Sequence, residues 1–178
     1  MRFKDYLEVI DFSPLYKTLK DRRVYHTELA EYTGKDRQNI QAMFRNERLS
    51  DTKFIFDTAK MLKCHISDIV SFTDIKPRYP LLSLPPKENS TLSYSVFLAN
   101  IEYAKGKPAS ELLADVDDMD LSEDLMKGFY PEGKDMTNRK LSPLIIRKII
   151  HNEPVHVTVI YNICKHFNCY PDDVLAVV

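Results

Sequence analysis

Glycine and cysteine are scarce in this sequence, and their scarcity argues against several classes of protein. Four glycines occur among 178 residues, and none belongs to a P-loop or a dinucleotide-binding motif. The three cysteines, Cys64, Cys164 and Cys169, do not make a disulfide framework. The histidines stand in no nucleophile motif. We therefore expect a protein that is not an enzyme and that carries no cofactor.

Long apolar runs are also missing. No stretch approaches the roughly 18 apolar residues that a membrane helix needs. The chain begins MRFKDYLEVIDF, which has no signal-peptide core. With 44% hydrophobic and 29% charged residues, the composition is that of a soluble globular protein. We expect a cytoplasmic protein that has no membrane partner.

Two clusters of possible metal ligands lack the pattern that a metal site needs. Residues 164–169 contain C-x-H-x2-C, but a zinc site usually takes a fourth ligand, and no second cluster stands near in sequence. The acidic stretch 115–124 contains no basic residue. When it is aligned as a calcium loop, Glu123 stands where glycine is needed and Phe129 where the bidentate glutamate is needed. No metal is expected.

Parts of the chain recur at a nearly constant distance. Asn46-Glu47 recurs as Asn152-Glu153, at an offset of 106 residues. AKMLKCHISDIV (59–70) aligns with CKHFNCYPDDVL (164–175) at an offset of 105. One residue has therefore been lost between the two matches. The sequence predicts two copies of one unit.

Helix starts and stops divide the first copy into five short helices. Thr27 is expected to cap the second helix, and Gly34 lies just past its end. Asp36 is expected to cap the third, over 36–46. The other starts are marked at Ser13-Pro14, Ser50-Asp51 and Ser67-Asp68. No segment of the first copy alternates as a strand does.

Prolines concentrate between the two copies. Residues 74–94 contain four prolines, which break helices and favour extended chain, so we interpret this stretch as a linker. Leu81, Leu82 and Leu84 are expected to hold it to a surface, with a short strand as the alternative. We predict an all-α protein with one unit over 1–73 and a second, divergent unit over 95–178. An acidic insertion at 115–139 distinguishes the second unit.

Charge is distributed unevenly along the chain. The net charge is −1, but residues 1–78 hold 15 Lys and Arg against 12 Asp and Glu. Residues 79–178 hold 10 against 14. Any electrostatic attraction to phosphate should therefore come from the first part.

The stretch TELAEYTGKDRQNIQAMFRNERLS (27–50) resembles the helix-turn-helix of the Cro/C1-type, or lambda-repressor-like, family. The matching features are Leu29-Ala30, Gly34 in the turn, capping Asp36, inward Ile40, and Asn46 where the loop begins. One departure is Lys35, where the family usually has an apolar residue. The resemblance implies two lambda-repressor-like helical units and a sequence-specific transcriptional regulator of the repressor kind, which binds double-stranded DNA.

The outward side chains of helix 36–46 suit DNA bases. Arginine suits guanine, and asparagine or glutamine suits adenine, each through paired hydrogen bonds in the major groove. Base contacts are therefore expected from Arg37, Gln38, Asn39 and Gln41. Phosphate contacts are expected from Thr27, Lys35, Arg45 and Arg48. The alternative is an ordinary solvated helix face.

The second copy differs at the matching helix, SPLIIRKII (142–150). Leu144 and Ile145 fall where Gln38 and Asn39 fall in the first copy, and they cannot hydrogen-bond to bases. We predict that this pair lies in a buried contact, either a homodimer interface or the boundary with the first unit. An irregular core within the chain is the alternative.

A competing hypothesis concerns the whole chain. Helix-turn-helix units can be recruited for protein contacts, so the chain could be a protein-binding adaptor or a phage-type inhibitor. In that case the second unit would dock a protein partner. The discriminating feature is the face that runs over 37–41, because DNA binding requires it to be exposed and basic.

Overall fold

The computed structural model describes residues 3–118 and 140–175, and these residues are mostly helical. The helices of the first half are α1 Phe3–Val9, α2 Ser13–Arg22, α3 His26–Thr33, α4 Arg37–Phe44, α5 Thr52–Leu62 and the 3-10 helix η1 Ile66–Asp68. Those of the second half are α6 Ser95–Lys105, α7 Ala109–Ala114, α9 Pro143–Ile150, α10 Val157–Phe167 and α11 Pro171–Val174. Most of the acidic insertion expected at 115–139 lies outside the described residues.

The all-α expectation is confirmed at the level of fold class, with one small addition. Strands β1 (Ile10–Asp11) and β2 (Ser71–Phe72) pair antiparallel, with Ile10 opposite Phe72. Each strand has two residues, which is too short for an alternating pattern to show in the sequence. This two-stranded β-ribbon, β1 with β2, closes the first half, because it joins the segment before α2 to the segment after η1.

The second half repeats the local geometry of the first at the offsets seen in the sequence. After α4, Asn46 has a positive φ of 53°, and after α9 Asn152 has a φ of 57°. In each case the next residue's amide closes the turn, from Glu47 to Ala42 and from Glu153 to Lys148. Asparagine tolerates the left-handed conformation better than most residues, so its recurrence has a structural cause.

The two halves meet where α5 and α10 begin. The amide of Thr52 donates to the carbonyl of Val155 at 2.9 Å, and the amide of Val157 donates to the carbonyl of Ser50 at 2.9 Å. Asp51 therefore lies opposite His156 in an antiparallel bridge. We call this contact, residues 50–52 with 155–157, the crossing. Its two hydrogen bonds exchange under the 105-residue offset, so the crossing has a local twofold axis.

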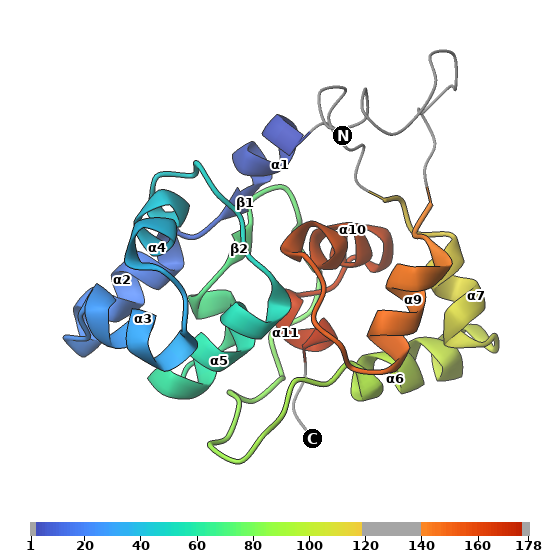
Figure 1. Cartoon of the computed structure of the whole chain (residues 1–178). Helices are drawn as coiled ribbons and strands as arrows, with labels where there is room; N and C mark the ends of the chain where they lie inside the picture. The colour runs from blue at the N-terminus through green and yellow to red at the C-terminus, as the bar shows by residue number, and fades with distance from the viewer. Residues whose placement is uncertain (1–2, 119–139, 176–178) are drawn as a thin grey trace.

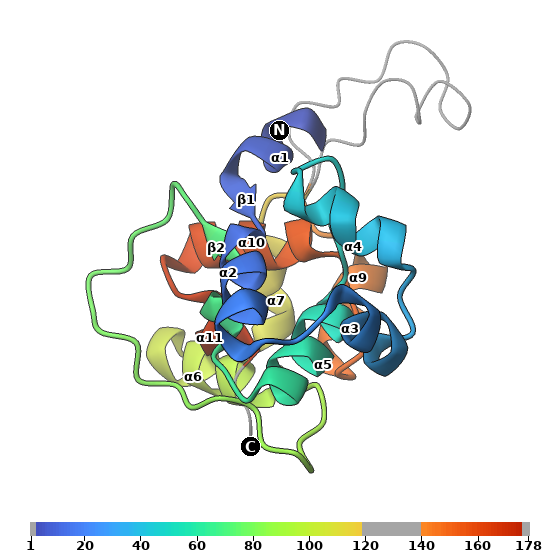
Figure 2. The same ribbon diagram turned by 90° about the vertical axis from the view of Figure 1, so that its left-hand side faces the viewer.

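The crossing places the two halves on either side of a shared centre. In Figure 1, α2, α3 and α4 form the left of the molecule and α6, α7 and α9 the right, with α5, α10 and α11 between them. Turned by 90°, α4 and α9 both lie toward the right of the view, so they occupy the same face (Figure 2). The linker passes along the left and lower edge, away from α4 (Figure 2).

The segment before α2 packs on the second half. The Tyr6 hydroxyl in α1 exchanges hydrogen bonds with the side-chain amide of Asn162 in α10, at 3.2 and 2.9 Å. The rings of Tyr6 and Phe72 both pack edge-on against Tyr161, with centroids 5.5 and 5.4 Å away. Buried apolar side chains of both halves belong to one core. Helix α1 therefore helps to hold the halves together.

The linker is attached by polar contacts and by Leu92, which packs against the core, rather than by Leu82 and Leu84. The Tyr79 hydroxyl donates to Asp173 at 2.7 Å, and the Lys60 ammonium donates to the carbonyl of Ser90 at 2.9 Å. Leu82 and Leu84 are 80% and 72% exposed, so the expectation that they pin the linker is wrong. No strand forms within 74–94, all of which is described. Prolines remove amide donors, so side chains such as those of Tyr79 and Lys60 supply the polar attachment.

Candidate nucleic-acid interface

The turn between α3 and α4 is set by local sequence signals. Helix α3 ends at Gly34, whose φ of 68° is the left-handed conformation that glycine adopts without strain. At its start, the carboxylate of Glu28 accepts from the amide of Tyr25 at 2.7 Å. The N-cap residue is thus Tyr25, and the expectation that Thr27 caps the helix is wrong. Glu28 stabilises the earlier start because it satisfies an amide that the helix leaves free.

Helix α4 is fixed by its cap and by one buried stripe. The carboxylate of Asp36 accepts from the amide of Gln38 at 2.6 Å, as the sequence predicts. Ile40 and Met43 are fully buried. At the far end, the ring of Phe44 packs against the rings of Tyr16 in α2 and His26 in α3. The outward face of α4 is therefore held at a defined angle to α2 and α3.

The four residues expected to contact bases differ in exposure. Arg37 and Gln38 are exposed at the start of α4. Asn39 and Gln41 are half-buried. The side-chain oxygen of Asn39 accepts a hydrogen bond from Arg48, so it has a partner within the chain. Arg37 and Gln38 are consequently the pair best placed to reach a ligand without rearrangement.

The residues expected to contact phosphate are likewise placed unequally. Thr27 is exposed near the start of α3. Lys35 turns toward the crossing, where its ammonium lies 3.0 Å from the Ser50 hydroxyl and 3.7 Å from the carboxylate of Asp51. Arg45 is exposed but pairs with Glu47 at 2.9 Å. Lys35 is thus held against the first half's side of the crossing, with its ammonium over the ring of Phe54 and near Asp51.

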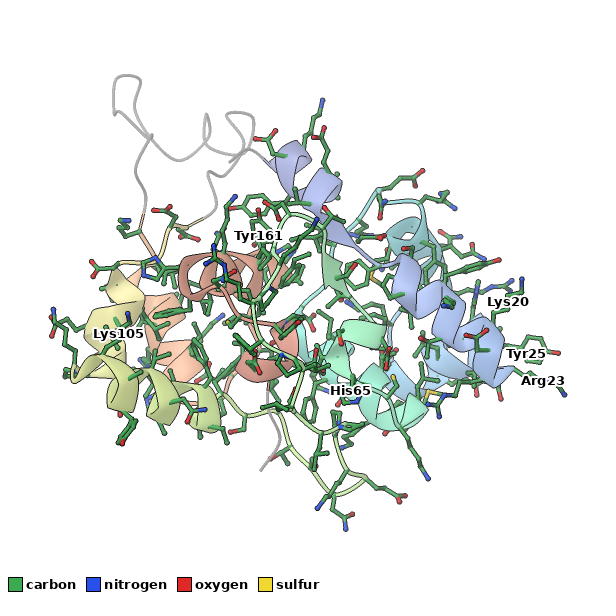
Figure 3. The ribbon with its side chains drawn as sticks, turned by 180° about the vertical axis from the view of Figure 1, so that it is seen from behind. Lys20, Arg23, Tyr25, His65, Lys105 and Tyr161 are labelled. Atoms are coloured by element: carbon green, nitrogen blue, oxygen red, sulfur yellow. The ribbon has the colours of Figure 1, made fainter. Side chains whose placement is uncertain are left out.

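Two basic residues that the sequence prediction did not include lie beside this site. Lys20 and Arg23, together with Thr27 and Arg37, line a hollow of about 490 Å³ between the end of α2 and the starts of α3 and α4. Figure 3 shows Lys20, Arg23 and Tyr25 together at one end of the molecule, pointing outward. The run of basic residues at 17–23 was the available signal. The arrangement suits an anion such as a backbone phosphate.

Helix α9 presents two large apolar side chains to the surface, Leu144 near its start and Ile150 at its end. The hydroxyl of Ser142 accepts from the amide of Ile145, and Ile146 and Ile149 are buried, as Ile40 and Met43 are in α4. Leu144 is 60% exposed, so it does not lie at the boundary with the first half. Ile145 is partly buried and packs against the core. The two residues of the predicted pair therefore differ, since Ile145 packs within the chain and Leu144 is exposed. A contact of Leu144 with a second chain stays a prediction.

The crossing carries a histidine whose charge state affects stability. His156 begins α10 and faces Asp51, with Lys35 nearby. Burial lowers the pKa of His156 below its ordinary value of 6.5, although the Asp51 carboxylate acts in the opposite direction. The unfolded chain therefore binds this proton more readily than the folded chain does. The stabilising effect of a neutral His156 is present above the ordinary pKa and is lost as the pH falls below it.

We expect the denaturant midpoint of unfolding to fall between about pH 7.5 and about pH 5.5, and His156→Gln to remove part of that fall. Glutamine keeps a polar side chain at the crossing but does not titrate. His166→Gln, at an exposed histidine in the same helix, is the matched control and should leave the pH dependence unchanged. Identical pH profiles for His156→Gln and the parent protein would contradict this account.

Comparisons with family models, with curated proteins and with solved structures found no match to this chain. Within residues 3–118 and 140–175, no helix is long and apolar enough to span a membrane. In the same residues, no three His, Cys, Asp or Glu side chains gather as metal ligands do. The geometry of α3, α4 and their neighbours is therefore the feature of the molecule that points to a function.

Proposed function

We propose that this protein is a sequence-specific double-stranded DNA-binding regulator of transcription, a repressor, that places α4 in the major groove. The observation that carries the proposal is the start of α4. Arg37 and Gln38 are exposed there, directly after a Gly34 turn and on a helix held by buried Ile40. A groove-reading helix needs this combination of a fixed buried stripe and outward groups that can bond base edges.

The surroundings of α4 support the proposal. Lys20 and Arg23 extend the basic surface from Arg37 toward the end of α2, where a phosphate backbone would pass. Helix α3 begins beside them, and Tyr25, His26 and Thr27 at its start line the same hollow. In this arrangement the two halves are two lambda-repressor-like units, 1–73 and 95–178, joined by the linker.

The hydrogen bond between Asn39 and Arg48 must break before Asn39 can contact a base. In the free protein the Asn39 oxygen is occupied, so a bidentate contact with adenine requires Arg48 to release it. Arg48 is exposed, so its guanidinium can turn to a phosphate without leaving a buried group unpaired. Binding therefore exchanges one exposed side-chain contact for two contacts with DNA.

We expect Arg37→Ala to weaken binding to a selected duplex by about 1–3 kcal/mol and to relax the preference at one base position. Arg45→Ala should weaken binding evenly across sequences and reduce the salt slope by about 1. The measurement is a set of duplex titrations at several salt concentrations, after selection of bound sequences from a random pool. Arg78→Ala, which removes an exposed arginine from the linker, is the charge-matched control.

Two results would reject the proposal. One is that no sequence is enriched from the pool by the parent protein. The other is that Arg37→Ala, Gln38→Ala and Asn39→Ala all bind as the Arg78→Ala control does. An adaptor that docks another protein through the exposed Leu144 is the second candidate function, and it predicts no enrichment of any duplex.

A further inference from the structure

Helix α9 occupies the place in the second half that α4 occupies in the first. Both helices have a capping side chain at the start, two buried residues at matching positions, and an asparagine of positive φ after the end. At the 106-residue offset, Leu144 corresponds to Gln38 and Arg147 to Gln41. The scaffold of a groove-reading helix is therefore kept in α9, while its outward side chains have changed.

The crossing fixes how the two helices are related. Its reciprocal hydrogen bonds, from Thr52 to Val155 and from Val157 to Ser50, give the halves a local twofold axis. Figure 1 shows α4 on the left and α9 on the right of the molecule, and Figure 2 shows both toward the same face. A twofold pair of reading helices on one face is the arrangement with which dimeric helix-turn-helix proteins meet two half-sites. Here one chain supplies both helices.

We propose, on the basis of the function proposed above, that a single chain binds an asymmetric operator. Helix α4 reads one half-site, and α9 contacts the neighbouring stretch of major groove with Leu144 against thymine methyl groups. The crossing and the shared core make the two halves one unit, so a second chain is not needed to complete the pair. This assigns DNA contact to an exposed leucine that the fold does not require.

The chemistry of α9 fits this second half-site. The thymine methyl is the apolar group that base edges present in the major groove, and a branched aliphatic side chain can cover it. Of the pair at the start of α9, Leu144 is 60% exposed and Ile145 is partly taken up by the core, so Leu144 is the member of the pair that can reach out. Arg147 and His151 are exposed on the same helix and its end, where they can meet phosphates. Residues 143–150 contain no acidic side chain that would repel the phosphates.

The experiment first removes the thymine methyl groups from the DNA while the protein is left unchanged. Sequences selected from a random duplex pool are resynthesised with uracil in place of thymine, first in one half-site and then in the other. Uracil in the half-site remote from the Arg37-dependent position should weaken binding about fourfold for each contacted methyl lost. Leu144→Gln should abolish this sensitivity and leave the preference at the other half-site unchanged. Leu82→Gln, at an exposed leucine of the linker, is the matched control.

Stoichiometry and footprint complete the test. Sedimentation of the complex should show one chain on one duplex, and the footprint should cover two successive major grooves on one side, about 34–36 Å apart. Two chains on the operator, dimers of the free protein that Leu144→Gln dissociates, or a footprint of one groove would overturn the inference and leave the DNA-binding function standing. If the parent protein enriches no duplex, both proposals fail together.

Discussion

Replacing Tyr161 with alanine is expected to lower the free energy of unfolding by about 3–5 kcal/mol, the range for loss of a buried aromatic side chain. Tyr161 is completely buried in α10. Its ring meets Tyr6 and Phe72, and its hydroxyl donates to Asp74 at 2.7 Å. The change therefore removes the contact between the second half and the ribbon that closes the first. Denaturant unfolding followed by circular dichroism measures the loss.

Two further variants separate packing from hydrogen bonding at this position. Tyr161→Phe keeps the ring and loses the bond to Asp74, so it should cost about 1 kcal/mol. Tyr103→Ala, at a tyrosine that is 94% exposed in α6, should stay within about 0.5 kcal/mol of the parent. A Tyr161→Ala protein as stable as Tyr103→Ala would show that the two halves do not depend on this contact.

Replacing Asp172 with alanine is expected to cost about 2–4 kcal/mol, because two amide donors are left without a partner. Asp172 in α11 is 2% exposed, and its carboxylate accepts from the amides of Ile66 at 2.7 Å and Ser67 at 3.0 Å. These are the first residues of η1, so one half caps a helix of the other. Burial raises the pKa of Asp172, although these hydrogen bonds act against the rise.

Asparagine at the same position gives a graded comparison. Asp172→Asn keeps one acceptor oxygen and turns an amide toward the second donor, so its cost should fall between the parent and Asp172→Ala. Asp21→Ala removes an exposed carboxylate from α2 and serves as the control for charge. Equal stability of Asp172→Ala and Asp21→Ala would mean that water replaces the carboxylate at η1.

Local signals in the sequence predicted the elements of the interface better than they predicted its contacts. Asp36 as a cap and Gly34 as a stop depend on neighbours within a few residues, so the sequence is sufficient to place α4. The inward turn of Lys35 and the pairing of Asn39 with Arg48 depend on residues brought close by the fold. Pattern and spacing along the chain contain no direct record of such contacts.

The pairing of the two halves could not be predicted from the sequence either. The crossing joins residues 50–52 to residues 155–157, and neither segment has the length or the alternation of a strand. The sequence places the one-residue loss between Glu47 and Ala59, and the hydrogen bonds of the crossing, which exchange at an offset of 105, place it before Ser50. Such a contact depends on how the fold brings the starts of α5 and α10 together, and the sequence shows these segments only as two apolar helices.

The bridge between Asp51 and His156 has a consequence for how such a protein can change over time. If two identical copies of the first half met through the same crossing, Asp51 would lie opposite its own copy, and like charges directly opposite one another are destabilising. In a homodimer every substitution occurs twice, so that position could never carry two different residues. Within one chain it can, and the residue facing Asp51 is a histidine. The tandem arrangement thus frees residues on the symmetry axis to become complementary rather than identical.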